Sequence, residues 1–257
     1  MGIVYLIGAG PGAPDLITIR GAEILARADI VFYDALIHPE TLALAGNAKK
    51  VAVGKRCGEI STDQRFINRS LVEASAQYEI VVRLKGGDPM LFGRAQEEIN
   101  VLEQHGIQYK IVPGVTAALA ASAELGIPLT QRGLSRSVTF LTTRVGIGQE
   151  ATDWARVVSA TDTAALYMWR DQAVEISATL QAHGMSSSTP VVIVENASLQ
   201  GCKHIRTTLG NLASALDGDL SGPAVLLLGK VFQEKVVAKG DTLRIDTLED
   251  SPSICFV

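Results

Sequence analysis

The sequence predicts an α/β protein of two domains, the first built on a mainly parallel sheet and the second on a mixed sheet. Short apolar runs alternate with helical patterns through the first half, which is typical of βαβ units. Proline, glycine and polar residues then cluster at residues 127–137, before a second series of apolar runs begins. We therefore expect domains at residues 1–132 and 133–240, followed by a polar tail at 241–257.

Each predicted element follows from its apolar pattern. Continuous apolar runs predict buried strands at residues 3–8, 29–34, 49–55, 79–89 and 109–114. Helical spacing predicts helices at residues 18–28, 64–77, 94–106 and 116–126, and Thr18 is a suitable N-cap for the first. In the second half, strands are predicted in "VTFLTTR", "TAALYMW", "TPVVIVENA" and "GPAVLLLGKVF", with helical segments at 173–183 and 211–216.

Composition excludes several classes of protein. The chain has 257 residues, of which 47% are hydrophobic and 19% charged, so it can form real cores. Its net charge of −4 argues against sequence-independent nucleic-acid binding. No apolar run is long enough to span a bilayer and no leader pattern precedes the first strand, so we expect a cytoplasmic protein without a membrane partner.

Metal-ligand patterns are also missing from the sequence. The three cysteines are scattered and odd in number, and the four histidines show no ligand spacing with them. We therefore expect reduced thiols and no bound metal.

The first glycine-rich turn, "GAGPGAPDL", resembles a dinucleotide-binding loop, but its prolines argue against that function. In such a loop the helix begins at the last glycine, and its amides meet the pyrophosphate. Here Pro11 and Pro14 each remove an amide donor, and the helix is expected to start only near Thr18. An NAD(P) oxidoreductase or a non-catalytic ligand-binding module therefore stays a minor alternative.

Three further turns follow predicted strands, at residues 54–58 ("GKRCG"), 85–89 ("KGGDP") and 112–118 ("VPGVTAA"). Ligands of open parallel sheets bind at the carboxyl ends of the strands, and glycine allows a close approach of ligand and backbone. Together with the first turn, these segments predict a ligand site at one sheet edge.

These same stretches carry a resemblance to a known family. "VYLIGAGPGAPDLITIRGAEILARADIVFYDALI", "VGKRCG", "VVRLKGGDPMLFGRAQEE" and "VPGVTAALAASAELGIPLTQRG" resemble the tetrapyrrole methyltransferase family, and most closely its branch that methylates uroporphyrinogen III. The resemblance covers residues 3–235 and implies two α/β domains with S-adenosylmethionine between them. It implies methylation at C2 and C7, giving precorrin-2 via precorrin-1 for sirohaem- or cobalamin-type biosynthesis, and a homodimer.

The resemblance also assigns roles to individual residues. Asp34 matches the family's proton acceptor and Lys55 its proton donor. The positions that match cofactor-binding residues are Pro11, Gly86, Gly87, Asp88, Leu91, Thr116, Ala117, Met168, Ala197 and Ala224. S-adenosylhomocysteine is the implied product.

The implied substrate is rich in carboxylates, so an acidic protein must meet it with local cations. Arg94 and Arg132 are the leading candidates, because the planar arginine fork pairs with carboxylates, and Glu97 is placed to orient Arg94. Arg136 is a further candidate. Many relatives read Thr-Gly-His where this chain has Thr142, Thr143 and Arg144, so Arg144 either favours an anionic substrate or faces solvent.

Two alternatives share the fold. A later corrinoid methyltransferase would act on a more methylated ring. An rRNA or protein methyltransferase is disfavoured by the acidic pI of about 5.6 and by the lack of a basic, aromatic-rich stripe.

Overall fold

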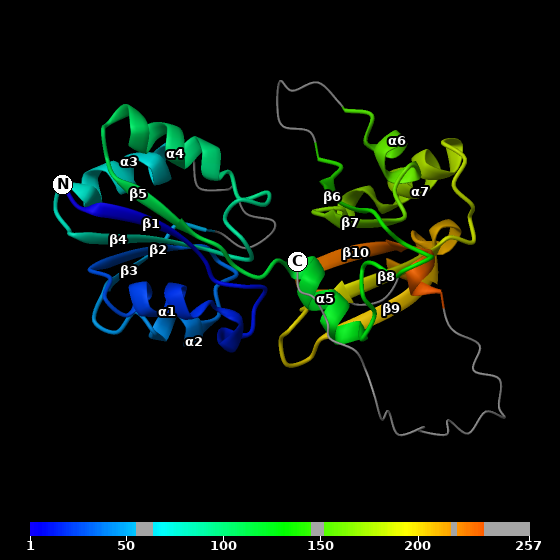
Figure 1. Ribbon diagram of the computed structural model, residues 1–257, viewed down its shortest axis with the longest axis horizontal. Helices are drawn as coiled ribbons and strands as arrows, with labels where there is room; N and C mark the ends of the chain where they lie inside the picture. Colours follow the sequence, from blue (N-terminus) through cyan, green and yellow to red (C-terminus); the bar gives the residue numbers. More distant parts are fainter. Residues whose placement is uncertain (55–63, 145–151, 217–219, 234–257) are drawn as a thin grey trace, which may run out of the picture.

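The computed structural model describes residues 1–54, 64–144, 152–216 and 220–233. These residues form two lobes, each containing one five-stranded sheet with helices packed on its faces (Figure 1). The two-sheet α/β architecture confirms the predicted fold class.

The first sheet has the order β3-β2-β4-β1-β5, and all its paired strands are parallel. It contains every strand predicted for the first half. Their bounds are β1 (Ile3–Gly8), β2 (Ile30–Tyr33), β3 (Lys49–Ala52), β4 (Ile80–Lys85) and β5 (Tyr109–Val112). Because the strands are parallel, their carboxyl ends lie at one edge, which faces the second lobe (Figure 1).

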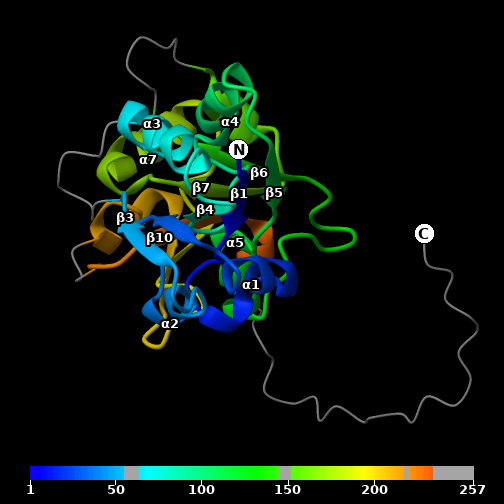
Figure 2. The ribbon, with the colours of Figure 1, turned by 90° about the vertical axis from the view of Figure 1, so that its left-hand side faces the viewer.

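Helices cover both faces of this sheet (Figures 1 and 2). The helices α1 (Ile19–Leu25) and α2 (Pro39–Ala43) lie on one face, and α3 (Gln64–Ser75) and α4 (Ala95–Gln104) on the other. The predicted N-cap is confirmed, since Thr18 Oγ1 accepts a hydrogen bond from the amide of Gly21 at 3.1 Å. The short helix α2 was not predicted.

The second sheet has the order β6-β7-β10-β8-β9 and is mixed, as predicted. Only β6 and β7 are parallel, and the other pairs are antiparallel. The bounds are β6 (Val138–Thr142), β7 (Thr163–Tyr167), β8 (Pro190–Glu195), β9 (Lys203–Thr208) and β10 (Ala224–Gly229). Strand β9 was not predicted, because its alternating polar residues lack the apolar run of its neighbours.

Helices also pack on this sheet. The helices α6 (Trp154–Ser159) and α7 (Ala173–Ala182) share an apolar cluster with one face, around the fully buried Trp169. Helix α5 (Ala117–Leu125) packs on the other face, where Ala118 and Ala121 contact a separate cluster. The helix predicted at 211–216 is wrong, since two single 3₁₀ turns, Leu209–Asn211 and Ser214–Leu216, occupy that region.

None of the helices in the described parts of the chain combines the length and apolar character needed to cross a bilayer.

Three glycines allow the turns after β1, β4 and β5 to touch. A Cβ on Gly8 would lie 2.6 Å from the carbonyl oxygen of Gly87, and a Cβ on Gly114 would lie 2.3 Å from the same atom. Gly87 itself has φ +66°, and it exchanges backbone hydrogen bonds with Gly10. No side chain fits at Gly8 or Gly114, so the three turns form one backbone-to-backbone contact.

We expect Gly114→Ala to destabilise the protein by about 1–3 kcal/mol or more, because the added methyl group overlaps backbone that cannot turn aside. Gly86→Ala is the matched control, since a Cβ there would meet nothing within 4 Å. Urea unfolding of both variants measures the difference. Equal free energies of unfolding for the two variants would show that the turns do not depend on this contact.

Candidate functional site

The carboxyl edge of the first sheet brings together the segments that the sequence singled out. Asp34 follows β2, Gly86 and Gly87 follow β4, and Thr116 follows β5. The loop after β1 joins them through the bridge between Gly10 and Gly87. The predicted convergence at one edge is therefore confirmed for the turns after β1, β4 and β5. The fourth predicted turn, at residues 54–58, lies outside the described residues except for Gly54.

Asp34 is held by an arginine that the sequence analysis missed. Arg83 Nη2 donates a hydrogen bond of 2.5 Å to Asp34 Oδ1, and the side chain of Asp34 remains 31% exposed. Arg83 Nε also donates to the buried Glu98, at 3.0 Å. Burial lowers the pKa of Arg83, but the charges and hydrogen bonds of Asp34 and Glu98 outweigh this, so its pKa is raised overall.

The other residue matched to proton transfer, Lys55, lies outside the described residues.

Asp88 shapes the loop that carries it. Its Oδ2 accepts the amide of Gly114 at 2.9 Å and its Oδ1 accepts the amide of Met90 at 2.8 Å. The carboxylate thus joins the turn after β4 to the turn after β5. Beside it, Gly86 is exposed bare backbone with open space where a side chain would stand.

The second sheet presents its own group of predicted residues at one edge. Met168 follows β7 and is 46% exposed, whereas Ala197 follows β8 and is 7% exposed. Ala224 begins β10, and its carbonyl accepts a hydrogen bond of 3.2 Å from the indole nitrogen of Trp169. Since β10 pairs with both β7 and β8, these three residues lie at neighbouring strand ends.

Contacts between the two edges involve the same segments. The amide of Ala13 donates to Ser198 Oγ at 3.0 Å. The Tyr167 hydroxyl lies 2.7 Å from Thr116 Oγ1 and accepts the amide of Ala118 at 3.2 Å. Burial raises the pKa of Tyr167, although both hydrogen bonds oppose this.

An aromatic contact adds to these bonds. The ring of Phe92 lies 5.2 Å from that of Tyr167, centroid to centroid. The loop after β4 in the first lobe therefore touches the end of β7 in the second.

Backbone strain concentrates in the same region. Among the described residues, the non-glycine residues with positive φ are Phe92, Arg94, Met168, Asn196 and Ser198. Every one belongs to a loop that carries a predicted site residue. Unfavourable backbone conformations of this kind persist only where the surrounding structure over-determines them.

The predicted substrate-binding residues fall into two groups. Arg94 and Glu97 form a bidentate pair, with nitrogen to oxygen distances of 2.6 and 2.8 Å, and about half of each side chain is exposed. The hydrogen bond from Arg94 lowers the pKa of Glu97. Arg132 is exposed in a separate turn, which is closed by hydrogen bonds between Gln131 and Ser135.

The structure also shows the position of Arg144, where this chain differs from many relatives. Its guanidinium pairs with Asp171 on the surface, and both side chains are half-exposed or more. Its charge is therefore engaged by a neighbour in the same lobe.

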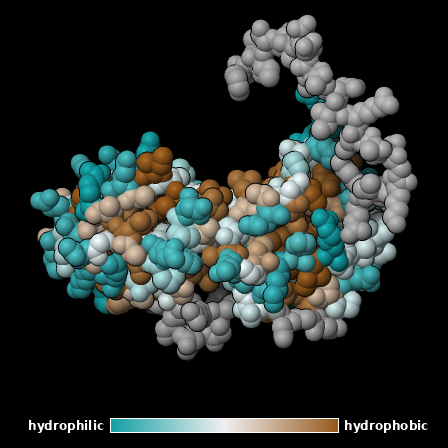
Figure 3. Space-filling view, turned by 90° about the horizontal axis from the view of Figure 1, so that it is seen from below, coloured by the Kyte–Doolittle hydropathy of each residue, from teal (hydrophilic) through white to brown (hydrophobic). Residues whose placement is uncertain are grey.

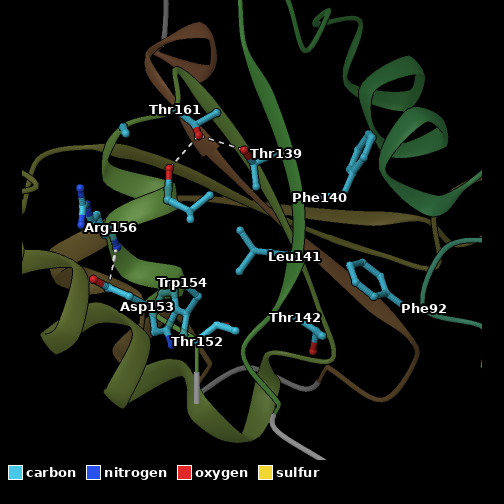
Figure 4. A pocket seen from close by; sticks show the side chains of 12 residues that line it. Phe92, Thr139, Phe140, Leu141, Thr142, Thr152, Asp153, Trp154, Arg156 and Thr161 are labelled. Atoms are coloured by element: carbon cyan, nitrogen blue, oxygen red, sulfur yellow. Dashed lines mark hydrogen bonds between the residues drawn. The ribbon is translucent and has the colours of Figure 1, made fainter. Parts of the chain in front are cut away.

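A cavity of about 830 Å³ lies along the edge strand β6, between Phe92, Phe140, Leu141 and Trp154 (Figure 4). Its lining is largely apolar and includes none of the residues matched to cofactor binding. In the described parts of the chain, no three His, Cys, Asp or Glu side chains converge as metal ligands.

Known proteins are similar to this chain over nearly its whole length. The family model for Tetrapyrrole (Corrin/Porphyrin) Methylases matches residues 3–213. Uroporphyrinogen-III C-methyltransferase of Pseudomonas aeruginosa is 42% identical over 236 residues, which cover 91% of this chain and 96% of that protein.

Two further proteins extend the comparison. Siroheme synthase of Hydrogenovibrio crunogenus is 40% identical over 90% of this chain, which spans about half (50%) of that longer protein. The crystal structure of uroporphyrin-III C-methyl transferase from Thermus thermophilus, complexed with S-adenosyl homocysteine, superposes with a TM-score of 0.78 and 36% identity, covering 90% of this chain and 98% of that one. Because the family model matches most of the chain and a relative 42% identical is covered over 96% of its length, this protein belongs to the tetrapyrrole methylase family.

Proposed function

We propose that this chain is an S-adenosylmethionine-dependent methyltransferase that methylates uroporphyrinogen III at C2 and C7, giving precorrin-2 through precorrin-1. The observation that carries the proposal is the 42% identity to the Pseudomonas aeruginosa uroporphyrinogen-III C-methyltransferase over 96% of that protein. The pathway served is of the sirohaem or cobalamin type, and the enzyme acts in the cytoplasm.

The residues at the two sheet edges fit S-adenosylmethionine. This molecule has no phosphate groups, so it requires apolar surface and backbone polar groups rather than a phosphate cradle. Gly86 offers exposed backbone with open space beside it, and the exposed Met168 offers an apolar side chain across the junction. The binding residues are Pro11, Gly86, Gly87, Asp88, Leu91, Thr116, Ala117, Met168, Ala197 and Ala224. The bound cofactor supplies a sulfonium methyl group that is already activated for attack by an electron-rich pyrrole carbon.

Asp34 is the proton acceptor in this proposal. When a ring carbon gains a methyl group, the macrocycle must lose or redistribute a proton, and a positioned carboxylate can accept it. Arg83 engages Asp34 Oδ1, and the remaining exposed part of the side chain is open to a substrate. Lys55 is the proton donor by its match to the family.

Cations near the site bind the carboxylates of the tetrapyrrole. Arg94 is held by Glu97 in a fixed orientation, and Arg132 is exposed. Arginine suits both positions because its guanidinium fork forms paired hydrogen bonds with carboxylates.

The organisation of the chain is part of the same proposal. The domains are residues 1–132 and 133–240, with a tail at 241–257. The separate apolar clusters of the two sheets support this division, and helix α5 extends from the first part onto the second sheet.

The working unit is a homodimer. The apolar cavity beside β6 supports this, since β6 is an edge strand of its sheet and Val157 next to it is 50% exposed. Apolar residues also lie exposed near the junction of the lobes (Figure 3).

If the working unit is a homodimer, light scattering of the purified protein should return twice the mass of one chain.

The direct test is an anaerobic incubation with methyl-labelled S-adenosylmethionine and uroporphyrinogen III, followed by mass spectrometry of the tetrapyrrole. We expect two added methyl groups. Tight binding of S-adenosylhomocysteine without transfer would reject this substrate and favour a later corrinoid. Absence of both would reject the cofactor as well.

Asp34→Asn should lower kcat by about 10²–10⁴-fold while leaving the KM of the tetrapyrrole nearly unchanged, because the amide keeps the shape but cannot accept the proton. Steady-state kinetics with both substrates measure this. Near-normal turnover with unchanged affinity would show that Asp34 is not the general base.

Arg132→Ala should raise the KM of the tetrapyrrole by about 10–100-fold, because a hydrogen bond between charged groups is lost. Binding of S-adenosylhomocysteine, measured by calorimetry, should not change. Arg20→Ala removes an exposed arginine from α1 and serves as the control. Equal losses of both affinities in Arg132→Ala would contradict a role specific to the substrate.

A further inference from the structure

Glu98 is a fully buried carboxylate in a helix position that would ordinarily be apolar. On α4 it shares the core-facing stripe with Ala95, Ile99 and Leu102, and its exposed fraction is 0%. Burying an ionised group is costly unless it is paired and hydrogen-bonded. At this buried position, the Glu98 carboxylate therefore requires charged hydrogen-bond donors.

Both charged partners come from one strand. Glu98 Oε1 accepts hydrogen bonds from Arg83 Nε at 3.0 Å and from Lys85 Nζ at 2.9 Å. Arg83 and Lys85 alternate with Leu84 on β4, so they lie on the sheet face covered by α3 and α4. Gln64, the first residue of α3, adds a weaker bond at 3.3 Å.

Arg83 and Lys85 connect Glu98 to different parts of the site. Arg83 contacts both Glu98 and Asp34, and its Nη2 lies 2.5 Å from Asp34 Oδ1. Lys85 ends β4 and is followed directly by Gly86 and Gly87. One oxygen atom, Glu98 Oε1, is thus the common acceptor beneath the carboxylate of Asp34 and beneath the glycine turn.

We propose that Glu98 is a positioning residue for the methyl-transfer site, which fixes Asp34 through Arg83 and anchors the Gly86–Gly87 turn through Lys85. This inference rests on the proposed function, because it assigns Asp34 its part in the reaction. Glu98 itself touches no substrate.

The network is arranged for orientation more than for stability. Arg83 donates to three different acceptors, Glu98, Asp34 and the carbonyl of Leu84, which leaves its guanidinium one orientation. Among the described residues, the other oxygen of Glu98, Oε2, is buried without a hydrogen-bond partner. Apolar side chains of similar volume often stabilise a core as well as buried ion pairs do, so stability alone does not account for this network.

Glu98 also opposes the lowering of the pKa of Lys85 by its surroundings. Burial and then the nearby charge of Arg83 lower the pKa of Lys85, and Glu98 acts in the opposite direction. Glu98 thus supports the charge of Lys85 under the turn.

The test is a set of kcat measurements on Glu98→Met, Asp34→Asn and the combined variant. Methionine keeps the length of the side chain but removes the acceptor, so we expect kcat to fall by about 10–100-fold as Asp34 loses its placement. At saturating S-adenosylmethionine, where a weakened cofactor turn does not limit turnover, Glu98→Met should cause little further loss of kcat in the Asp34→Asn background, because both changes then act on the same step. Losses that multiply would overturn the proposal in favour of a merely structural role.

Matched variants separate orientation from general damage. Glu98→Gln retains an oxygen acceptor and should recover part of the lost kcat. Glu103→Gln, on the same helix, alters an exposed carboxylate that accepts the Tyr109 hydroxyl, and it should leave kcat unchanged. If Glu98→Met does not fold, Lys85→Met combined with Glu98→Met removes one buried charge of each sign and allows the same comparison.

A crystal structure of Glu98→Met gives a readout that does not depend on activity. We expect the contact between Arg83 and Asp34 to be lost or displaced. An unchanged contact would overturn the positioning role, whatever the kinetics. Wild-type protein that fails to methylate uroporphyrinogen III would instead reject the proposed function, while the structural comparison still tests the inference.

Discussion

The contact of three backbone turns at the carboxyl edge of the first sheet is the constraint on which the site depends. Gly8, Gly87 and Gly114 approach so closely that no side chain fits between the turns at either outer position. The loop after β1, the loop after β4 and the start of α5 are all placed relative to this contact. Because it is made by backbone atoms, the geometry of the edge does not depend on rotamers. The surface offered to a ligand is therefore formed by the fold itself.

The charged side chains under this surface are paired with side chains of opposite charge. Arg83 and Lys85 lie beneath the edge but are paired with Asp34 and Glu98, and at the rim Arg144 is engaged by Asp171. Arg83 and Lys85 are buried as well as paired, so they add little to the attraction of an anion from solution. In the proposed function, the substrate carboxylates are therefore met by the exposed side chains of Arg94 and Arg132, and Arg83 and Lys85 orient the site from below.

The strands of the first sheet could be predicted because their apolar runs and intervening helices are strong local signals. The predicted site segments also converge, since parallel strands place their carboxyl ends together. Strand β9 and helices α2 and α6 carry weaker patterns and were missed. The segment at 211–216 has apolar residues at helical spacing but only enough length for 3₁₀ turns.

The ionic network could not be predicted from the sequence. Arg83 stands in an apolar run, but the partner that allows its burial lies 15 residues away on α4. Its second partner, Asp34, lies 49 residues away, directly after the adjoining strand β2. Such pairings are set by how the helix packs on the sheet, and no local pattern encodes them. Lys55 lies outside the described residues, so its role stays a prediction.

Two neighbouring glycines, Gly86 and Gly87, are restricted by different interactions. Gly87 is fixed by its own backbone, with φ +66°, in contact with two other turns, so folding constrains this position whatever ligand is bound. Gly86 has open space where a side chain would stand, so only a ligand would restrict it. A substitution at position 86 is therefore limited by a bound ligand, whereas a substitution at position 87 is limited by the fold. The turn thus combines, in two adjacent residues, one position open to ligand binding and one position required for folding.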